Sequence, residues 1–116
     1  MGFKYFTRDE FKCSHTGENE IDDELIKRLD ELREACGFPF VITSGYRSPK
    51  HPIENKKIKP GTHGQGIAAD IAVTDSVRRR RVVHCAILLG FKGIGVAKDF
   101  VHVDLRKTGP VMWTYD

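Results

Sequence analysis

The sequence predicts a small α+β domain, in which an antiparallel sheet carries a metal site and two principal helices pack around it. Three observations lead to this fold class. Residues 67–73 and 100–105 alternate with period 2, which is typical of strands. Residues 21–36 carry apolar side chains at helical spacing. Residues 74–89 begin with capping residues and end before a glycine, as a second helix would.

The chain has 116 residues, of which 40% are hydrophobic and 30% are charged, an ordinary composition for a globular domain. We therefore expect one domain over residues 1–116, large enough for a hydrophobic core but marginal without added stabilisation. A bound metal would supply such stabilisation, because it binds the native state. The formal net charge of +3 is mild and does not require a nucleic-acid partner.

The first predicted helix follows an aromatic-rich lead-in, residues 3–12, which we expect to pack a small edge element onto the domain. Asp22 and Asp23 lie near the start of the helix and Gly37 lies just past its end, which are typical start and stop signals. The apolar positions at helical spacing are Ile21, Leu25, Leu29, Leu32 and Cys36. This helix is expected to be scaffold.

A short buried strand is predicted over residues 39–43, and it leads directly into Ser44-Gly45-Tyr46-Arg47. A strand end followed by a glycine turn is a usual place to present a functional side chain. The guanidinium of Arg47 can hold a carboxylate with two hydrogen bonds, or stabilise the oxyanion that forms when water attacks a peptide carbonyl. The alternative is an ordinary surface arginine.

The second strand, residues 67–73, carries a single carboxylate, Asp70, on a face of very small residues. Alanines beside Asp70 leave room for an ion or a substrate. His63 precedes this strand in a loop with glycines at positions 61, 64 and 66, which permit sharp turns. In the last predicted strand, His102 and Asp104 share one face, while Val101, Val103 and Leu105 form the other.

Two adjacent strands can therefore bring Asp70 and His102 to one metal ion, with His63 as a third ligand. Imidazole nitrogen and carboxylate oxygen together suit zinc, with a water in the fourth position. Asp99 lies at the bend before the last strand, where it escapes the alternation, and is predicted to be the base that activates this water. Asp104 is predicted to orient a ligand histidine. The alternative is that each of these side chains is merely hydrogen-bonded or solvated.

Three motifs occur in a fixed order. They are Ser44-Gly45-Tyr46-Arg47-Ser48-Pro49, then His63-x6-Asp70 within Gly66-x-Ala68-x-Asp70, and then Asp99-x-x-His102. Together they resemble the zinc D-Ala-D-Ala metallopeptidases, which cleave peptidoglycan stem peptides and share a fold with the Hedgehog signalling domain. The resemblance covers most of the chain and is closest to small single-domain members often carried by bacteriophages. Thr62 departs from the pattern, since many relatives have Ser before the histidine. Gly64-Gln65 also departs from it, since many relatives have a bulkier pair after the histidine.

The resemblance implies a Hedgehog/DD-peptidase-like fold, one zinc ion held by His63, Asp70 and His102, and the peptidoglycan stem peptide as substrate. It implies a role for Arg47 in substrate and transition-state stabilisation, and places Ser44 and Tyr46 in the segment that binds substrate or supports the site. The reaction is hydrolysis of a peptide bond by metal-activated water. A D-Ala-D-Ala carboxypeptidase and an L-Ala-D-Glu or cross-bridge endopeptidase both fit. The rival is a non-catalytic, zinc-stabilised binding module of the same fold.

The remaining candidate ligands lack a partner pattern. The three cysteines, Cys13, Cys36 and Cys85, contain no CxxC pair, so we expect free thiols, with Cys36 and Cys85 in the core. No role is assigned to His15 or His51. The lysines at positions 50, 56, 57 and 59, in the loop over residues 49–62, are expected to keep that loop solvated. His84 is expected to pack or cap within the second helix.

Arg78-Arg79-Arg80-Arg81 is the one feature that favours nucleic acid. Four successive arginines spread around a helix, and no aromatic platform accompanies them, so we expect a solvated helix start. No apolar run is long enough for a signal peptide or a membrane span. We therefore expect a monomer without membrane insertion. It would be synthesised in the cytoplasm and reach the cell wall through phage lysis or virion delivery.

Overall fold

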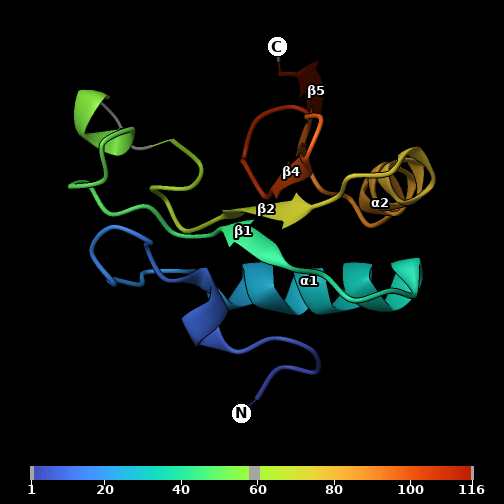
Figure 1. Ribbon diagram of the computed structural model, residues 1–116, viewed down its shortest axis with the longest axis horizontal. Helices are drawn as coiled ribbons and strands as arrows, with labels where there is room; N and C mark the ends of the chain where they lie inside the picture. Colours follow the sequence, from blue (N-terminus) through green and yellow to red (C-terminus); the bar gives the residue numbers. More distant parts are fainter. Residues whose placement is uncertain (1, 58–60, 116) are drawn as a thin grey trace.

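The computed structural model describes residues 2–57 and 61–115, and its elements confirm the α+β class (Figure 1). In chain order they are η1 (Arg8–Phe11), α1 (Asp23–Cys36), β1 (Ile42–Ser44), η2 (Glu54–Lys56), β2 (Ala68–Ala72), α2 (Ser76–Leu88), β3 (Gly93–Val96), β4 (Phe100–Asp104) and β5 (Val111–Thr114). Figure 1 shows α1 running beside β1, with α2 seen nearly end-on beyond the end of β2. Among the described residues, no helix is long and apolar enough to cross a membrane.

Helix α1 begins and ends where its capping residues predict. The side chain of Asp22 accepts a hydrogen bond from the backbone N–H of Glu24, and so satisfies one of the free donors of the first turn. Gly37 ends the helix in the left-handed region, at φ 80°. The buried side chains of α1 are Leu25, Ile26, Leu29, Leu32 and Cys36. Full burial of one such leucine contributes about 2 kcal/mol.

The five strands form one sheet in the order β1-β2-β4-β3-β5. The pairs β1/β2, β2/β4 and β3/β4 are antiparallel, as predicted, but β5 pairs parallel with β3, so the sheet is mixed. The predicted antiparallel arrangement is therefore confirmed for β1, β2, β4 and β3, and the parallel pair comes from β5, a strand that was not predicted from the sequence. The chain reverses after β4 and crosses to the far edge of β3, so β5 runs in the same direction as β3.

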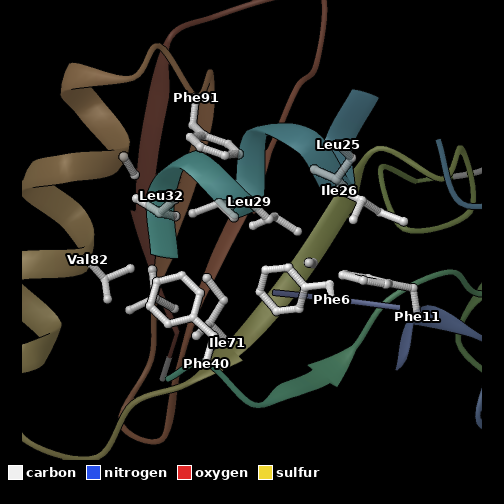
Figure 2. Close-up of a cluster of buried hydrophobic side chains, with 14 of the residues drawn as sticks. Phe6, Phe11, Leu25, Ile26, Leu29, Leu32, Phe40, Ile71, Val82 and Phe91 are labelled. Carbon is white, nitrogen blue, oxygen red and sulfur yellow. The ribbon is translucent and has the colours of Figure 1, made fainter. Parts of the chain in front are cut away.

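The hydrophobic core lies between the sheet and the helices, on the strand face opposite the predicted ligands. Ala69, Ile71 and Val73 from the β2 segment belong to it, together with Val101 and Val103 of β4, which confirms the predicted alternation. Figure 2 shows Phe6 and Phe11 of the aromatic lead-in packed near α1, and Phe40 beside Ile71. Cys13, Cys36 and Cys85 are free thiols in this core.

Helix α2 buries only Val82, Cys85 and Ala86, and its arginines are partly structural. The Arg78 guanidinium lies 4.8 Å from the centre of the Phe38 ring, Arg79 donates to the carbonyl of Lys98, and Arg81 donates to the carbonyl of Cys36. His84 is exposed, so the expectation that it packs within the helix is wrong. It faces the solvent because the three buried positions of α2 lie on the opposite side.

Candidate metal centre

The sheet register brings two of the predicted ligands together. Asp70 of β2 and His102 of β4 are direct cross-strand partners. His63 comes from the tight turn before β2, where the backbone N–H of Gly66 donates to the His63 carbonyl and that of Arg47 donates to the same oxygen. Gly66 is required in this turn, because its φ is +75° and a Cβ would lie 2.3 Å from the carbonyl oxygen of Glu20.

The three side chains converge on one point. His102 Nδ1 lies 3.0 Å from Asp70 Oδ1, His63 Nε2 lies 3.2 Å from the same oxygen, and the two ring nitrogens are 3.2 Å apart. All three residues are buried, and one ligand atom from each lies within 4.8 Å of the others. A carboxylate and two imidazoles at this spacing form a compact set of donors for one cation.

Hydrogen bonds on the outer side of each ring fix which nitrogen faces the centre. His63 Nδ1 lies 2.8 Å from the carbonyl oxygen of Gly45, which can only accept, so Nδ1 carries the proton and Nε2 presents its lone pair. His102 Nε2 lies 2.8 Å from Asp104 Oδ2, so its Nδ1 presents the lone pair. Both neutral imidazoles are thus held in the tautomer that a metal requires, and the donor set fits zinc.

Asp104 is itself firmly held. It is fully buried, and it accepts two hydrogen bonds from the Arg106 side chain, at 2.9 Å and 2.7 Å, and one from the Arg106 backbone. Gly93 on the neighbouring strand leaves the space it needs, since a Cβ there would lie 2.2 Å from Asp104 Oδ2. Burial alone would raise the pKa of Asp104, but the hydrogen bonds from His102 and Arg106 outweigh burial and hold it well below its usual range.

The electrostatics of the centre favour an ionised carboxylate. Burial alone would raise the pKa of Asp70, but hydrogen bonds and charge interactions with His102 and His63 lower it to about 2. Burial alone would lower the pKa of His102, but its hydrogen bonds to Asp104 and Asp70 raise it overall. The raised pKa favours a proton on His102 beside the charged Asp70. A cation can replace that proton.

Arg47 reaches the centre from the turn after β1. Its Nη2 lies 3.9 Å from Asp70 Oδ2, and its Nη1 lies 4.0 Å from Glu54 Oε2. Both separations are too long for hydrogen bonds. Its Nε is buried and has no hydrogen-bond partner among residues 2–57 and 61–115. The guanidinium therefore lies beside the ligand set with donors to spare.

The remaining predicted site residues are Ser44, Tyr46 and Asp99, and they occupy different places around the three converging side chains. Ser44 pairs with Asp70 across β1 and β2, whereas Tyr46 is buried in the hydrophobic core. Asp99 lies at the bend before β4, where its carbonyl accepts from the Val73 N–H. The Asp99 carboxylate is exposed, and in the described part of the chain no hydrogen bond or ion pair joins it to the three converging residues.

Two residues that sequence reasoning did not single out belong to the surroundings of the site. They are Glu54, on the loop before His63, and Arg106, just past β4. Arg106 follows Asp104 by two residues on the same strand end, and this spacing could have indicated the pair. Glu54 has no comparable signal. His51 also lies in this loop, with its ring 4.5 Å from that of His15, and burial together with the neighbouring His15 lowers the pKa of His51.

A buried centre of two histidines and one carboxylate, carried by an α+β sheet, is typical of zinc hydrolases that keep a coordination position open. The family model described as Peptidase M15 matches residues 4–104, and the chain belongs to this family. The resemblance to the zinc D-Ala-D-Ala metallopeptidases is thereby confirmed. No curated protein matches the chain in a sequence comparison. The protein is a zinc peptidase of a family that acts on peptidoglycan, and the buried group of His63, Asp70 and His102 can hold one ion.

Proposed function

We propose that this protein hydrolyses a peptide bond in the stem peptide or cross-bridge of peptidoglycan, as an endolysin-like enzyme of the small phage type. The convergence of His63, Asp70 and His102 within 4.8 Å, beside a guanidinium with unused donors, carries this proposal. Cleavage of an internal bond, such as L-Ala-D-Glu, is the form we favour. Removal of a terminal D-Ala is the alternative.

Zinc bound by these three residues would polarise the scissile carbonyl and lower the pKa of the attacking water. Asp99 accepts a proton from the attacking water as the oxygen of that water bonds to the carbonyl carbon. As the C–N bond breaks, Asp99 passes the proton to the leaving amine. The exposed Asp99 carboxylate has no competing partner among the described residues, which supports this role.

Arg47 stabilises the negative charge that develops on the carbonyl oxygen, or holds a carboxylate of the substrate. Its buried Nε, which has no partner in the described part of the chain, supports this role, because a preorganised donor costs no rearrangement during the reaction. A hollow of about 200 Å³ adjoins the same segment, and its lining includes Ser44, Gly45, Tyr46 and Arg47. Asp9, Glu10, Lys12 and Ser14 also line it, and we propose that part of the stem peptide occupies it.

The test is digestion of purified muropeptides by the zinc-loaded protein, read by mass spectrometry. Loss of a terminal Ala would identify a carboxypeptidase, and an internal cut would identify an endopeptidase and its bond. A protein that holds one zinc ion but releases nothing from walls of several chemotypes would be a binding module instead. We further propose that the monomeric protein reaches the wall through phage lysis or virion delivery. Fractionation of producing cells before and after lysis tests this route.

A further inference from the structure

Glu54 is a buried carboxylate that the proposed reaction does not use. It lies in η2, on the loop that precedes His63, and only 5% of its surface is exposed. Its Oε2 lies 2.8 Å from Lys57 Nζ, and its Oε1 accepts a hydrogen bond of 3.0 Å from the backbone N–H of Gly61. Burial alone would raise the pKa of Glu54, but these hydrogen bonds and the charges of Lys57 and Arg47 lower it overall, so it is an anion.

This anion lies near Arg47, whose guanidinium also lies near Asp70. One guanidinium nitrogen lies 4.0 Å from Glu54 and another lies 3.9 Å from Asp70, so the cation is nearly equidistant from two carboxylates. Because neither contact is a hydrogen bond, the guanidinium is placed by the balance of two attractions. If one carboxylate lost its charge, the guanidinium would be drawn toward the other.

We propose that Glu54 is a positioning residue that holds Arg47 away from Asp70. With Glu54 charged, the Asp70 carboxylate stays available to the metal, and the donors of Arg47 stay available to the substrate. With Glu54 neutral, Arg47 closes onto Asp70 as a bidentate ion pair and competes with zinc for that ligand. The part of this inference that concerns substrate rests on the proposed function, whereas the part that concerns zinc does not.

A simpler role would confine Glu54 to the loop, where it fastens Gly61 and Lys57. The variant Glu54→Gln separates the two roles, because its amide oxygen can still accept from Gly61 while its charge is gone. A third possibility is that Glu54 attracts zinc through its field alone. In that case, removing the charge of Glu54 would weaken zinc binding at least as much in the Arg47→Ala background as in wild type.

The experiment is a double-mutant cycle on zinc affinity, measured by competition with a chromogenic chelator. It compares wild type, Glu54→Gln, Arg47→Ala and the double variant. We expect Glu54→Gln to weaken zinc binding about tenfold in the presence of Arg47. In the Arg47→Ala background we expect most of that loss to disappear. An equal or larger loss in that background, or no loss in wild type, would overturn the proposal.

Two further variants keep the result interpretable. Glu54→Asp retains the charge but withdraws it by one methylene, so we expect a loss of about twofold to threefold that again vanishes with Arg47→Ala. If Glu54→Gln does not fold, as judged by circular dichroism, the comparison of Glu54→Asp with and without Arg47→Ala decides whether Glu54 acts through Arg47. Glu31→Gln, an exposed carboxylate on α1 that pairs with Arg28, is the matched control and should leave zinc affinity unchanged. If the wild type binds zinc but cuts no muropeptide, the proposed function fails while the zinc cycle still decides the role of Glu54.

Discussion

The two sides of the metal centre are built differently. On the His102 side, every polar contact is short: the ring is 2.8 Å from Asp104, and Asp104 is held by three hydrogen bonds from Arg106. On the Arg47 side, the contacts to Asp70 and Glu54 are 3.9 Å and 4.0 Å, and one buried donor has no partner among the described residues. The polar groups of the first side have hydrogen-bond partners, so we call this side saturated. The second side has a buried donor without a partner in the described part of the chain, so we call it unsaturated.

This difference separates two tasks. A saturated side fixes a ligand ring, because any tilt of His102 would break a charge-assisted hydrogen bond. An unsaturated side can bind, because its donors gain partners only when a ligand arrives. Strand β4 supplies the rigid side, whereas the turn after β1 and the described part of the following loop, residues 49–57 and 61–62, supply the open side. The predictions below test this division, beginning with the largest effect.

Loss of the shared carboxylate should have the largest effect. Asp70→Asn keeps the shape of the side chain but removes the negative charge on which both histidines converge. We expect zinc affinity to fall by at least about 100-fold, beyond the usual range for residues behind the ligands. Zinc retained after dialysis, measured by atomic absorption, checks this. Full zinc occupancy in this variant would show that the two imidazoles suffice without Asp70.

The matched variant Asp99→Asn should separate metal binding from reaction. Asp99 is exposed at the bend before β4, and in the described part of the chain no hydrogen bond or ion pair joins its carboxylate to the ligand set, so zinc affinity should stay within about twofold of wild type. Muropeptide cleavage should fall by about 10² to 10⁴, the usual cost of losing a general base. Full activity in Asp99→Asn would leave the peptidase standing but would exclude Asp99 as the base.

On the saturated side, Asp104→Asn should weaken zinc binding by about tenfold to 100-fold without removing a ligand. The amide can still approach His102 Nε2, but it no longer fixes the tautomer by charge, and it leaves Arg106 without its counter-ion. We expect the free energy of unfolding to fall by about 1–3 kcal/mol as well. Chelator competition and urea unfolding measure the two effects separately. Unchanged values for both would show that this side is not the rigid one.

The rigid side could largely be predicted from sequence, because the patterns that build it lie within short stretches of the chain. Period 2 places His102 and Asp104 on one face of β4 and Val103 on the other, and the same alternation turns Asp70 toward them. Once β2 and β4 are neighbours, the register makes Asp70 and His102 partners. The predicted ligand residues are therefore brought together by short-range pattern and one strand pairing.

The open side could not be predicted in the same way. The burial of Glu54 depends on Lys57, Gly61 and Arg47 closing around it, and no spacing in a loop of lysines and prolines marks that enclosure. The parallel pairing of β5 with β3 was missed for a related reason. Its direction is set by where the chain crosses after β4, and a local pattern in residues 111–114 does not record this.

The pH dependence of the metal-free protein should reflect the centre. The pKa of Asp70 is lowered from its usual 3.8 to about 2, so the stabilisation from this group is fully present above pH 3.8 and is lost as the pH falls toward 2. The expected loss is about 2 kcal/mol. The pKa of His102 is raised, so its contribution is present below pH 6.5 and is lost as the pH rises.

Urea unfolding of the metal-free protein from pH 2 to pH 8 measures the stability lost at low pH (the acid limb) and the stability lost at high pH (the alkaline limb). Asp70→Asn is the control. In that variant the acid limb should shrink, because the group that titrates there is gone, and the alkaline limb should shrink as His102 loses a partner. An acid limb of unchanged size would assign the titration to other carboxylates and would show that Asp70 is not stabilised by its two histidines.

The smallest expected effect comes from Lys57→Met, on the open side. Lys57 is 39% exposed at its side chain, and it pairs with Glu54 over one turn of the loop, so its loss should cost at most about 1 kcal/mol of unfolding free energy. Zinc affinity should stay within about twofold of wild type, because Glu54 keeps both the Gly61 N–H and the attraction of Arg47. Thermal unfolding and chelator competition give the two values. A loss of zinc affinity as large as that of Glu54→Gln would mean that Glu54 acts by fastening the loop, since Lys57 touches the loop and not Arg47. The open side would then owe its geometry to the contacts among Glu54, Lys57 and Gly61, and the two sides of the centre would differ in flexibility rather than in unused charge.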